Sequence, residues 1–209
     1  MILSIISDTT KNEYKGIFNE IPVSPGDVFF IPPGTVHAIC GEVLVGEIQQ
    51  SSDITYRIYD WDRVGLDGKP RQLHIEEALE VINFKQVGLQ KSNGLSYIEQ
   101  GHDITIWGAC KYFSVEEIKL AGTLNLQKDN LKFIILTFIS GEAVVKYGKN
   151  DRLDVKAGDT IFIPAALRDI KIMGRGKFLK SYVPDIKNDI IQKLIRYGYS
   201  SKDISKCLA

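Results

Sequence analysis

The stretch GDVFFIPPGTVHAIC, residues 26–40, has the pattern of a short strand, a tight turn and a second segment that carries a lone histidine. Gly26 permits a sharp entry turn, and the apolar run 28–31 predicts a strand that crosses a β-sandwich. Pro32 ends that strand at a position where no ladder donor is needed. The pattern therefore places His37 just beyond a turn, at the mouth of a small barrel.

The same pattern occurs a second time, which indicates an internal repeat. Residues 24–39, SPGDVFFIPPGTVHAI, align position by position with residues 156–171, KAGDTIFIPAALRDIK. In the second copy Asp169 stands where the first copy has His37. The repeat predicts one structural unit that is used twice, with chemistry expected only in the first copy.

The composition of the chain argues against several classes of function. Its 209 residues contain 26 Lys and Arg and 26 Asp and Glu, with no run of like charges that would favour a nucleic acid or an anionic membrane surface as partner. The opening MILSIISDTT is apolar over only six residues, so it predicts neither a signal peptide nor a membrane span, and a cytoplasmic protein is expected. The three cysteines show no C-x-x-C spacing and are expected to be reduced thiols, with Cys40 buried in packing.

Hydrophobic periodicity predicts a mainly β chain with a few helices. Strands are expected at 28–31 and 43–50, and an amphipathic helix is expected over 73–83. In the second half, the runs 133–139 and 143–147 predict two strands joined by a hairpin turn at Gly141. Short strands with tight turns are typical of small barrels and sandwiches.

The ends of the chain complete the predicted organisation. A short helix is expected over Tyr14–Phe18, and helical spacing after Asp185 predicts a helix pair with a serine cap between its members. The predicted domains are the remainder of a first barrel with its helices over 1–85, a second, degenerate barrel over 86–184, and a helical tail over 185–209.

The spacing of the first copy resembles a known superfamily motif. Gly26, Pro32, Gly34 and His37 fill the pattern G-x5-P-x-G-x2-H, which is similar to the second motif of the cupins. The resemblance implies antiparallel jelly-roll barrels whose interior holds a metal or a small ligand. The expected fold class is thus mainly β, with two cupin-type jelly-roll barrels, a few helices and a short C-terminal helix pair.

The sequence after this motif makes the resemblance more specific. The stretches GEIQQSSDITYRIYDWDR and PRQLHIEEAL look like the C-terminal portion of type I mannose-6-phosphate isomerases of the Bacillus-like branch. The resemblance implies a zinc-dependent enzyme that interconverts mannose 6-phosphate and fructose 6-phosphate. It also implies His37 as a metal ligand, Arg57 as the active-site arginine, and Glu47 and Asp53 as residues of the substrate pocket.

These residue types suit that chemistry. Aldose to ketose conversion moves a proton between adjacent carbons through an enediol, so it needs an electrophile and a group that transfers the proton. Zinc would act as the Lewis acid, and the permanent cation of Arg57 would stabilise the enediolate or hold the anionic substrate. The sequence does not identify the group that carries the proton.

The chain also departs from the family pattern. It has three histidines and no Q-x-H-P motif, so three of the four expected metal ligands are missing, and it resembles the C-terminal two-thirds of such an enzyme. Since a catalytic zinc needs three protein ligands, the chain is expected to bind zinc poorly and to turn over little unless a second polypeptide supplies the rest. His74 is expected to cap a helix or lie on the surface, and His102 to lie in a loop.

Three alternatives remain open at this point. The chain could be a metal-free cupin module that binds a sugar phosphate through Arg57 without isomerase activity, or a structural remnant without a ligand. A cupin isomerase or epimerase that acts on another sugar phosphate is the third, because the fold alone does not decide the chemistry. Arg57 and Arg63 could also be simple ion-pair partners of Asp53, Asp60 and Asp62, and Glu47 could pair with an arginine such as Arg57, with no role in binding. The oligomeric state is not readable from the sequence.

Overall fold

The computed structural model describes residues 19–52, 54–61, 63–85, 91–126 and 131–208. The chain forms two compact units, one of residues 1–46 and 51–91 and the other of residues 47–50 and 92–209. The helix predicted over Tyr14–Phe18 lies outside the described residues, and the division into three domains stays a prediction.

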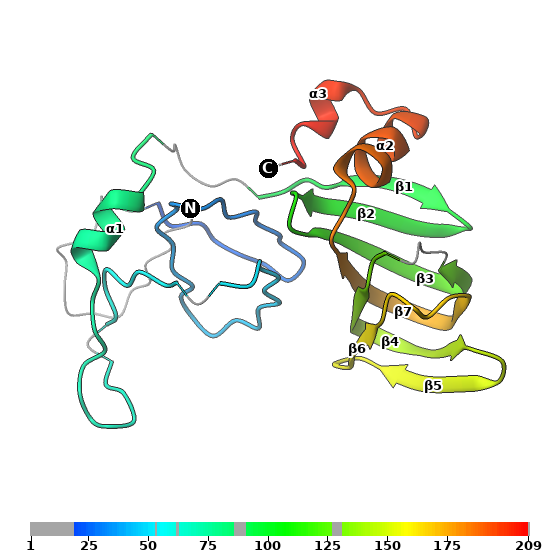
Figure 1. Ribbon diagram of the computed structural model, residues 1–209, viewed down its shortest axis with the longest axis horizontal. Coiled ribbons are helices and arrows are strands. Elements are labelled where there is room, and N and C mark those ends of the chain that lie inside the picture. Colours follow the sequence, from blue (N-terminus) through cyan, green and yellow to red (C-terminus); the bar gives the residue numbers. More distant parts are fainter. Residues whose placement is uncertain (1–18, 53, 62, 86–90, 127–130, 209) are drawn as a thin grey trace. The chain divides into compact units, whose positions relative to one another are not determined.

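The second unit is an antiparallel β structure, which confirms the mainly β class (Figure 1). Its strands follow the order β1-β2-β3-β7-β4-β5, and β6 pairs with β4 off this path. The strands are β1 Leu95–Glu99, β2 His102–Ala109, β3 Ser114–Leu126, β4 Ile134–Tyr147, β5 Asp151–Lys156, β6 Thr160–Ile163 and β7 Ile170–Tyr182.

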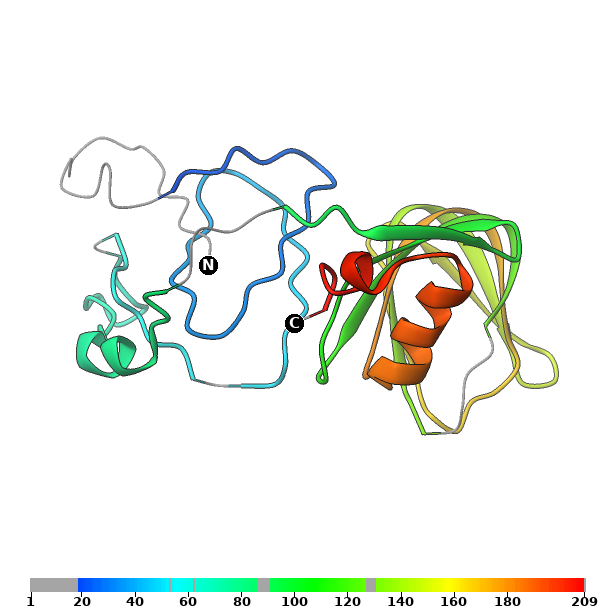
Figure 2. The same ribbon diagram turned by 90° about the horizontal axis from the view of Figure 1, so that it is seen from above.

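The long strands β3, β4 and β7 bend, and the sheet curves around its own core (Figure 2). The first half of β4 pairs with β6, and its second half pairs with β5. Both halves pair with β7, so β4 and β7 run through two layers of sheet. This is how a jelly-roll arrangement forms from strands that pass from one layer to the other.

Gly141 lies inside β4, so the hairpin predicted at this residue is wrong. Residues 134–147 form one strand, in which Gly141 has a φ of 76° and pairs with Gly176 of β7. A Cβ atom at Gly141 would overlap the backbone carbonyl of Arg175. The glycine thus permits a bend and a close approach of two backbones rather than a chain reversal.

The core of the second unit comes from alternate residues of the strands and from the C-terminal helices. Phe178, Ile172 and Leu136 are fully buried, as the period of two along a strand requires. The tail adds a π-helical turn η2 Ile186–Ile191, α2 Gln192–Arg196 and α3 Ser201–Ile204, and buries Ile190, Leu194 and Ile204 in the same core.

The helix pair predicted at the C-terminus is confirmed, including its serine cap. The Ser200 hydroxyl accepts a hydrogen bond from the backbone N–H of Asp203 at 3.2 Å. Gly198 ends the preceding helix with a φ of 88°. No helix in the described part of the chain is both long enough and apolar enough to cross a membrane.

Among its described residues the first unit has helix α1 Ile75–Val81, within the range predicted for it. The strands predicted at 28–31 and 43–50 are wrong, since the described part of this unit has only isolated bridges. A sequence with strand character forms a strand only when a neighbouring strand hydrogen-bonds its backbone N–H and C=O groups. The described extended segments of this unit have no such neighbouring strand. A second barrel is therefore not confirmed.

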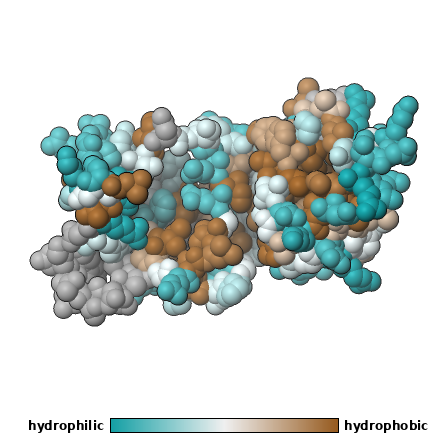
Figure 3. Space-filling model, turned by 90° about the horizontal axis from the view of Figure 1, so that it is seen from below, coloured by the Kyte–Doolittle hydropathy of each residue, from teal (hydrophilic) through white to brown (hydrophobic). Residues whose placement is uncertain are grey.

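Apolar side chains of the first unit lie on its surface. Figure 3 shows hydrophobic side chains exposed on one face of the molecule. Leu44 and Leu66 are fully exposed, and α1 buries only Ala78. Cys40 is half-buried rather than buried as expected. Burial of a strand-type segment requires a packing layer, and the described residues of this unit do not provide one for these side chains.

The internal repeat is visible as two turns with the same hydrogen bonds. The backbone N–H of Ser24 donates to Oδ2 of Asp27 at 2.6 Å, and the N–H of Lys156 donates to Oδ2 of Asp159 at 2.8 Å. The intervening Gly26 and Gly158 have φ angles of 97° and 94°. The Gly-Asp pair thus forms the same left-handed turn in both copies, as glycine at that position allows.

Candidate functional site

Of the predicted site residues, Arg57 lies beside the carboxylate of Asp60. Arg71 donates to both carboxylate oxygens of Asp60, from Nε at 2.5 Å and from Nη2. Nε of Arg57 lies 3.7 Å from Oδ1 of the same carboxylate. Asp60 is only 8% exposed, so this pair is a charge-assisted contact in a sheltered position.

The hydrogen bond from Arg71 holds the pKa of Asp60 below its usual value, although burial opposes this shift. The charges of Arg71, Arg57 and Arg63 lower the same pKa further. Asp60 is therefore a fixed anion that holds arginines in place, and it is not a candidate for proton transfer near neutral pH.

Arg57 is positioned by the segment before helix α1. Its Nη1 donates to the carbonyl of Gln72 at 3.2 Å, and its backbone N–H donates to Nδ1 of His74 at 3.2 Å. The N–H of His74 donates back to the carbonyl of Arg57 at 2.7 Å. His74 begins the helix as predicted, but its ring makes no cap hydrogen bond and instead accepts from Arg57. It is a positioning residue for the arginine.

His37 lies on an exposed loop with its ring fixed. Its Nδ1 lies 2.8 Å from the carbonyl of Thr35, which is buried. Because a carbonyl only accepts, Nδ1 donates in this contact, and in the tautomer with a single proton Nε2 has the free lone pair. This is the form in which histidine binds a metal, with the other nitrogen held by a backbone carbonyl.

The turn before His37 is tied to the end of α1. The carbonyl of Gly34 accepts a hydrogen bond from the N–H of Asn83 at 2.8 Å. Gly34 has a φ of 77°, and a Cβ atom there would lie 2.5 Å from the carbonyl oxygen of Val81. Only glycine fits this approach, which explains its place in the motif.

The structure does not bring all predicted site residues together. His37 and Arg57 are in the first unit, whereas Glu47 is exposed and groups with the second. Asp53 lies outside the described residues. Over the described ranges no three His, Cys, Asp or Glu side chains are grouped as metal ligands, so these residues alone do not fit a catalytic zinc.

His102 is a core residue, so the prediction that it lies in a loop is wrong. It opens β2, is 1% exposed and has both ring nitrogens in hydrogen bonds. Its Nδ1 accepts from the N–H of Ala121 at 3.0 Å, and Nε2 lies 3.0 Å from the carbonyl of Thr123. It connects β2 to the bend of β3 and is not available as a ligand.

Sequence reasoning considered Asp60 as an ion-pair partner of Arg57 but missed the roles of Arg71 and His74 around them. Asp60 lies in IYDWDR, where acidic residues and arginines are close together in the sequence, whereas Arg71 lies in PRQ, which entered only through the family resemblance. A carboxylate between aromatic residues, with several arginines near it in sequence, is a signal for a buried charge pair. That signal could have identified Asp60, though not which arginine binds it.

Lowering the pH is expected to destabilise the contacts around Asp60. Since its folded-state pKa is depressed, Asp60 contributes stability above its unfolded pKa, near 3.8, and loses it as the pH falls through the folded value. NMR titration of the Asp60 carboxyl and the Arg57 amide should show the two signals changing together below the unfolded pKa. Asp60→Asn should abolish the change at Arg57, and Asp154→Asn in the second unit should leave it intact. An Arg57 amide insensitive to Asp60 would contradict this role.

The antiparallel sheet with its Gly-Asp turn places the second unit among the cupin domains. Residues 103–183 match the family model of the mannose-6-phosphate isomerase cupin domain. The chain is therefore related to the mannose-6-phosphate isomerases, and its residues 103–183 are similar to the cupin domain of that family.

Relatives and a solved structure agree with this assignment. Mannose-6-phosphate isomerase ManA of Bacillus subtilis is 34% identical over 173 residues, which cover 83% of this chain and 54% of the relative. The mannose-6-phosphate isomerase of Streptococcus mutans is 28% identical over 170 residues, covering 81% of this chain and 52% of the relative. The crystal structure of the Bacillus subtilis enzyme aligns with a TM-score of 0.55 and 30% identity, over 62% of this chain and 40% of that one. The chain thus spans about half the length of these relatives.

Proposed function

We propose that this chain handles the sugar phosphate in the isomerisation of mannose 6-phosphate to fructose 6-phosphate, in the cytoplasm. The observation that carries the proposal is the position of Arg57. Arg71 occupies both oxygens of Asp60, so Arg57, at 3.7 Å, is held by Asp60 without a direct hydrogen bond to it. Its side chain is 24% exposed, which leaves a fixed cation for an anionic substrate.

The proposed chemistry follows from that cation. Isomerisation creates an enediolate, and a permanently charged guanidinium that is fixed beforehand stabilises this charge without reorganisation. Asp60, Gln72 and His74 fix the guanidinium or its backbone. Glu47 and Asp53 remain proposed residues of the substrate pocket through the family resemblance alone.

His37 is proposed as one ligand of a zinc ion. Its exposed Nε2 has the required lone pair, but one ligand is not sufficient for a catalytic zinc. The remaining ligands have to come from outside the residues described here, in this polypeptide or in a second one. Isomerase activity is therefore expected only when those remaining zinc ligands are present.

Isomerase activity is expected when the chain is mixed with the part of Bacillus subtilis ManA that it does not cover, in the presence of zinc. A coupled assay of fructose 6-phosphate formation measures the turnover. In the mixture, Arg57→Ala should lower kcat by on the order of 100-fold. Arg152→Ala, which removes an exposed arginine of the β4–β5 hairpin, should leave kcat unchanged. Absence of turnover from the mixture would refute the isomerase assignment.

A second candidate function is a metal-free module that binds sugar phosphates. It is favoured by the lack of a three-ligand group among the described residues. Calorimetry of the full chain with mannose 6-phosphate in EDTA distinguishes this module from the zinc-dependent isomerase. Binding that requires Arg57, without turnover in any zinc-containing mixture, would support the module.

A further inference from the structure

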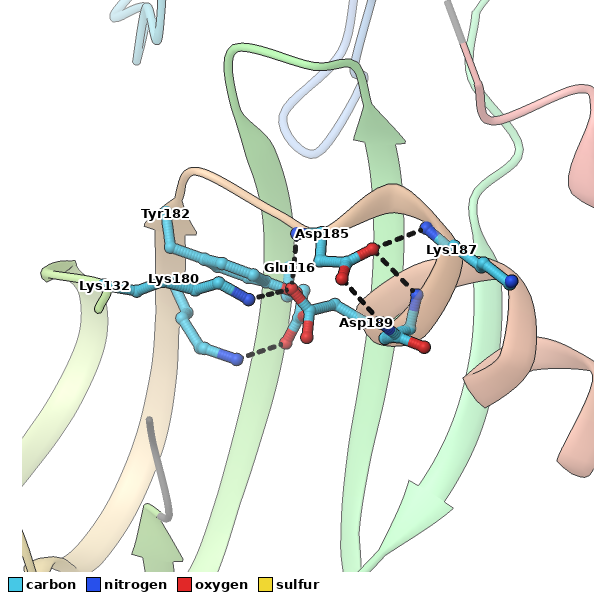
Figure 4. Close-up of polar contacts among 8 residues, drawn as sticks. Glu116, Lys132, Lys180, Tyr182, Asp185, Lys187 and Asp189 are labelled. Atoms are coloured by element: carbon cyan, nitrogen blue, oxygen red, sulfur yellow. Dashed lines mark hydrogen bonds and ion pairs between the residues drawn. The ribbon is translucent and has the colours of Figure 1, made fainter. Parts of the chain in front are cut away.

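The second unit, for which the sequence predicted no chemistry, contains a buried charged cluster. Glu116 of β3 has a side chain only 2% exposed. Its Oε1 accepts from the hydroxyl of Tyr182 at 2.6 Å, and its Oε2 accepts from Nζ of Lys180 at 3.0 Å. Figure 4 shows Lys180 and Tyr182 of β7 directed at the carboxylate.

The strand register explains how these groups meet. Glu116 is paired directly with Lys180 across β3 and β7, and Ser114 is paired with Tyr182. All four lie on the face of the sheet that carries the core, because side chains alternate along each strand. Burial raises the pKa of Glu116, but Lys180 and Lys193 outweigh it and hold the pKa below its usual value. The interior therefore contains an ionised carboxylate.

A cavity of about 230 Å³ adjoins this cluster. Glu116 and Lys180 form its wall together with Glu99 of β1 and Lys193 of α2. Nζ of Lys193 lies 3.0 Å from Oε2 of Glu99 and 4.9 Å from the ring centre of Tyr97. The wall thus has two cations and two anions in two ion pairs, so its formal charge is balanced.

Two residues with amide side chains are part of the cavity lining. They are Gln100 and Asn125, and both residues are exposed. Nε2 of Gln100 donates to the backbone carbonyl of Asn125 at 3.0 Å, and Oε1 of Gln100 accepts from the backbone N–H of Asn125 at 2.9 Å. Amides offer both donors and acceptors, as hydroxyl groups of a ligand require.

Two hydroxyls on the interior face have no hydrogen-bond partner among the described residues. They are the Tyr97 hydroxyl, on a residue 6% exposed, and Oγ of Ser114, on a fully buried residue. Tyr97 pairs with Ile104, a wall residue of the cavity, and Ser114 lies two residues before Glu116 on the same face. Both hydroxyls belong to the buried interior of this unit, and neither residue lines the cavity.

We propose that this cavity of the second unit binds a small, neutral, polyhydroxylated molecule of monosaccharide size. The paired charges offer no net attraction for an ion, whereas they present carboxylate acceptors and ammonium donors for hydroxyl groups. The volume is below the ~300–1,000 Å³ of pockets for drug-sized ligands, which selects a small occupant. The proposal stands independently of Arg57 and of the isomerase reaction.

Calorimetry and saturation-transfer NMR of the full chain with D-mannose and D-mannitol test the proposal. Binding is expected, and Glu116→Gln and Lys193→Met should each weaken it by at least about tenfold. Lys202→Met, at an exposed position of α3, is the matched control and should bind as the unmodified chain does. Arg57→Ala should also leave this binding unchanged, which separates the cavity from the proposed isomerase site.

Several outcomes would overturn the proposal. They are no binding of either probe, binding of inorganic phosphate or mannose 6-phosphate only, or binding that Glu116→Gln and Lys193→Met do not weaken. Thermal unfolding shows which variants fold. If Glu116→Gln does not fold, Lys193→Met decides, because Lys193 is on a surface helix and is 20% exposed.

Discussion

Lys180→Met is expected to lower the free energy of unfolding of the second unit by about 3–5 kcal/mol. The change removes the cation directly opposite Glu116 and leaves its buried carboxylate with the Tyr182 hydroxyl and the charge of Lys193, without a hydrogen-bonded cation. A buried charge without its partner loses the compensation for its desolvation, which costs far more than the loss of an exposed ion pair.

Hydrogen exchange of β3 and β7 peptides in the full chain measures the effect, because these strands report the second unit alone. Lys177→Met is the matched control. Lys177 lies on the same strand, and its Nζ is 3.5 Å from Glu117, but it is 36% exposed. The expected loss there is below about 1 kcal/mol. Equal losses for the two variants would contradict the assignment of Glu116 as a buried, ionised group.

Gly141→Ala is expected to destabilise the second unit by at least about 3 kcal/mol. The added Cβ would overlap the carbonyl oxygen of Arg175 and would lie 2.6 Å from Cα of Gly176. Both are backbone atoms of β7, so relief requires β4 and β7 to separate. The φ of 76° adds the strain of a left-handed alanine.

Gly158→Ala separates the cost of the steric overlap from the cost of the backbone strain. Gly158 also has a positive φ, 94°, but nothing lies within 4 Å of an added Cβ atom. It should therefore cost only about 1–2 kcal/mol of backbone strain. Urea unfolding followed by the β4 amide signals gives both values. If Gly141→Ala were no worse than Gly158→Ala, the close approach of the two strands would not determine stability.

The strands of the second unit were predictable where apolar and polar residues alternate along the sequence. The β-rich second half and the capped helix pair were confirmed because alternation and caps are local signals. The bend at Gly141 was not, since glycine between two apolar runs suits a hairpin and a bent strand equally well. Only the contact with Gly176 of β7, far along the chain, selects the bent strand.

The candidate site was only partly predictable. Arg57 and His37 were identified through motifs, and the structure gives each a defined orientation. The hydrogen bond between Arg57 and His74 joins residues 17 positions apart, and no periodicity specifies it. Glu116 lies on the same face of β3 as Ser114 and Ile118, but it was missed because two adjacent glutamates suggest a strand face exposed to solvent. Whether such a glutamate is buried depends on its partner across the neighbouring strand, which the local sequence does not show.

The two Gly-Asp turns have a consequence for the order of folding. Each closes over three residues with a side-chain bond and a backbone bond, and the copy at Ser24–Asp27 forms in a unit whose described residues contain no strand. Contacts this local form early, before the entropy of long-range pairing has to be overcome. The turn is thus encoded locally and does not depend on the sheet around it. At Lys156–Asp159 it can set the direction of β6 against β5 before either strand finds β4.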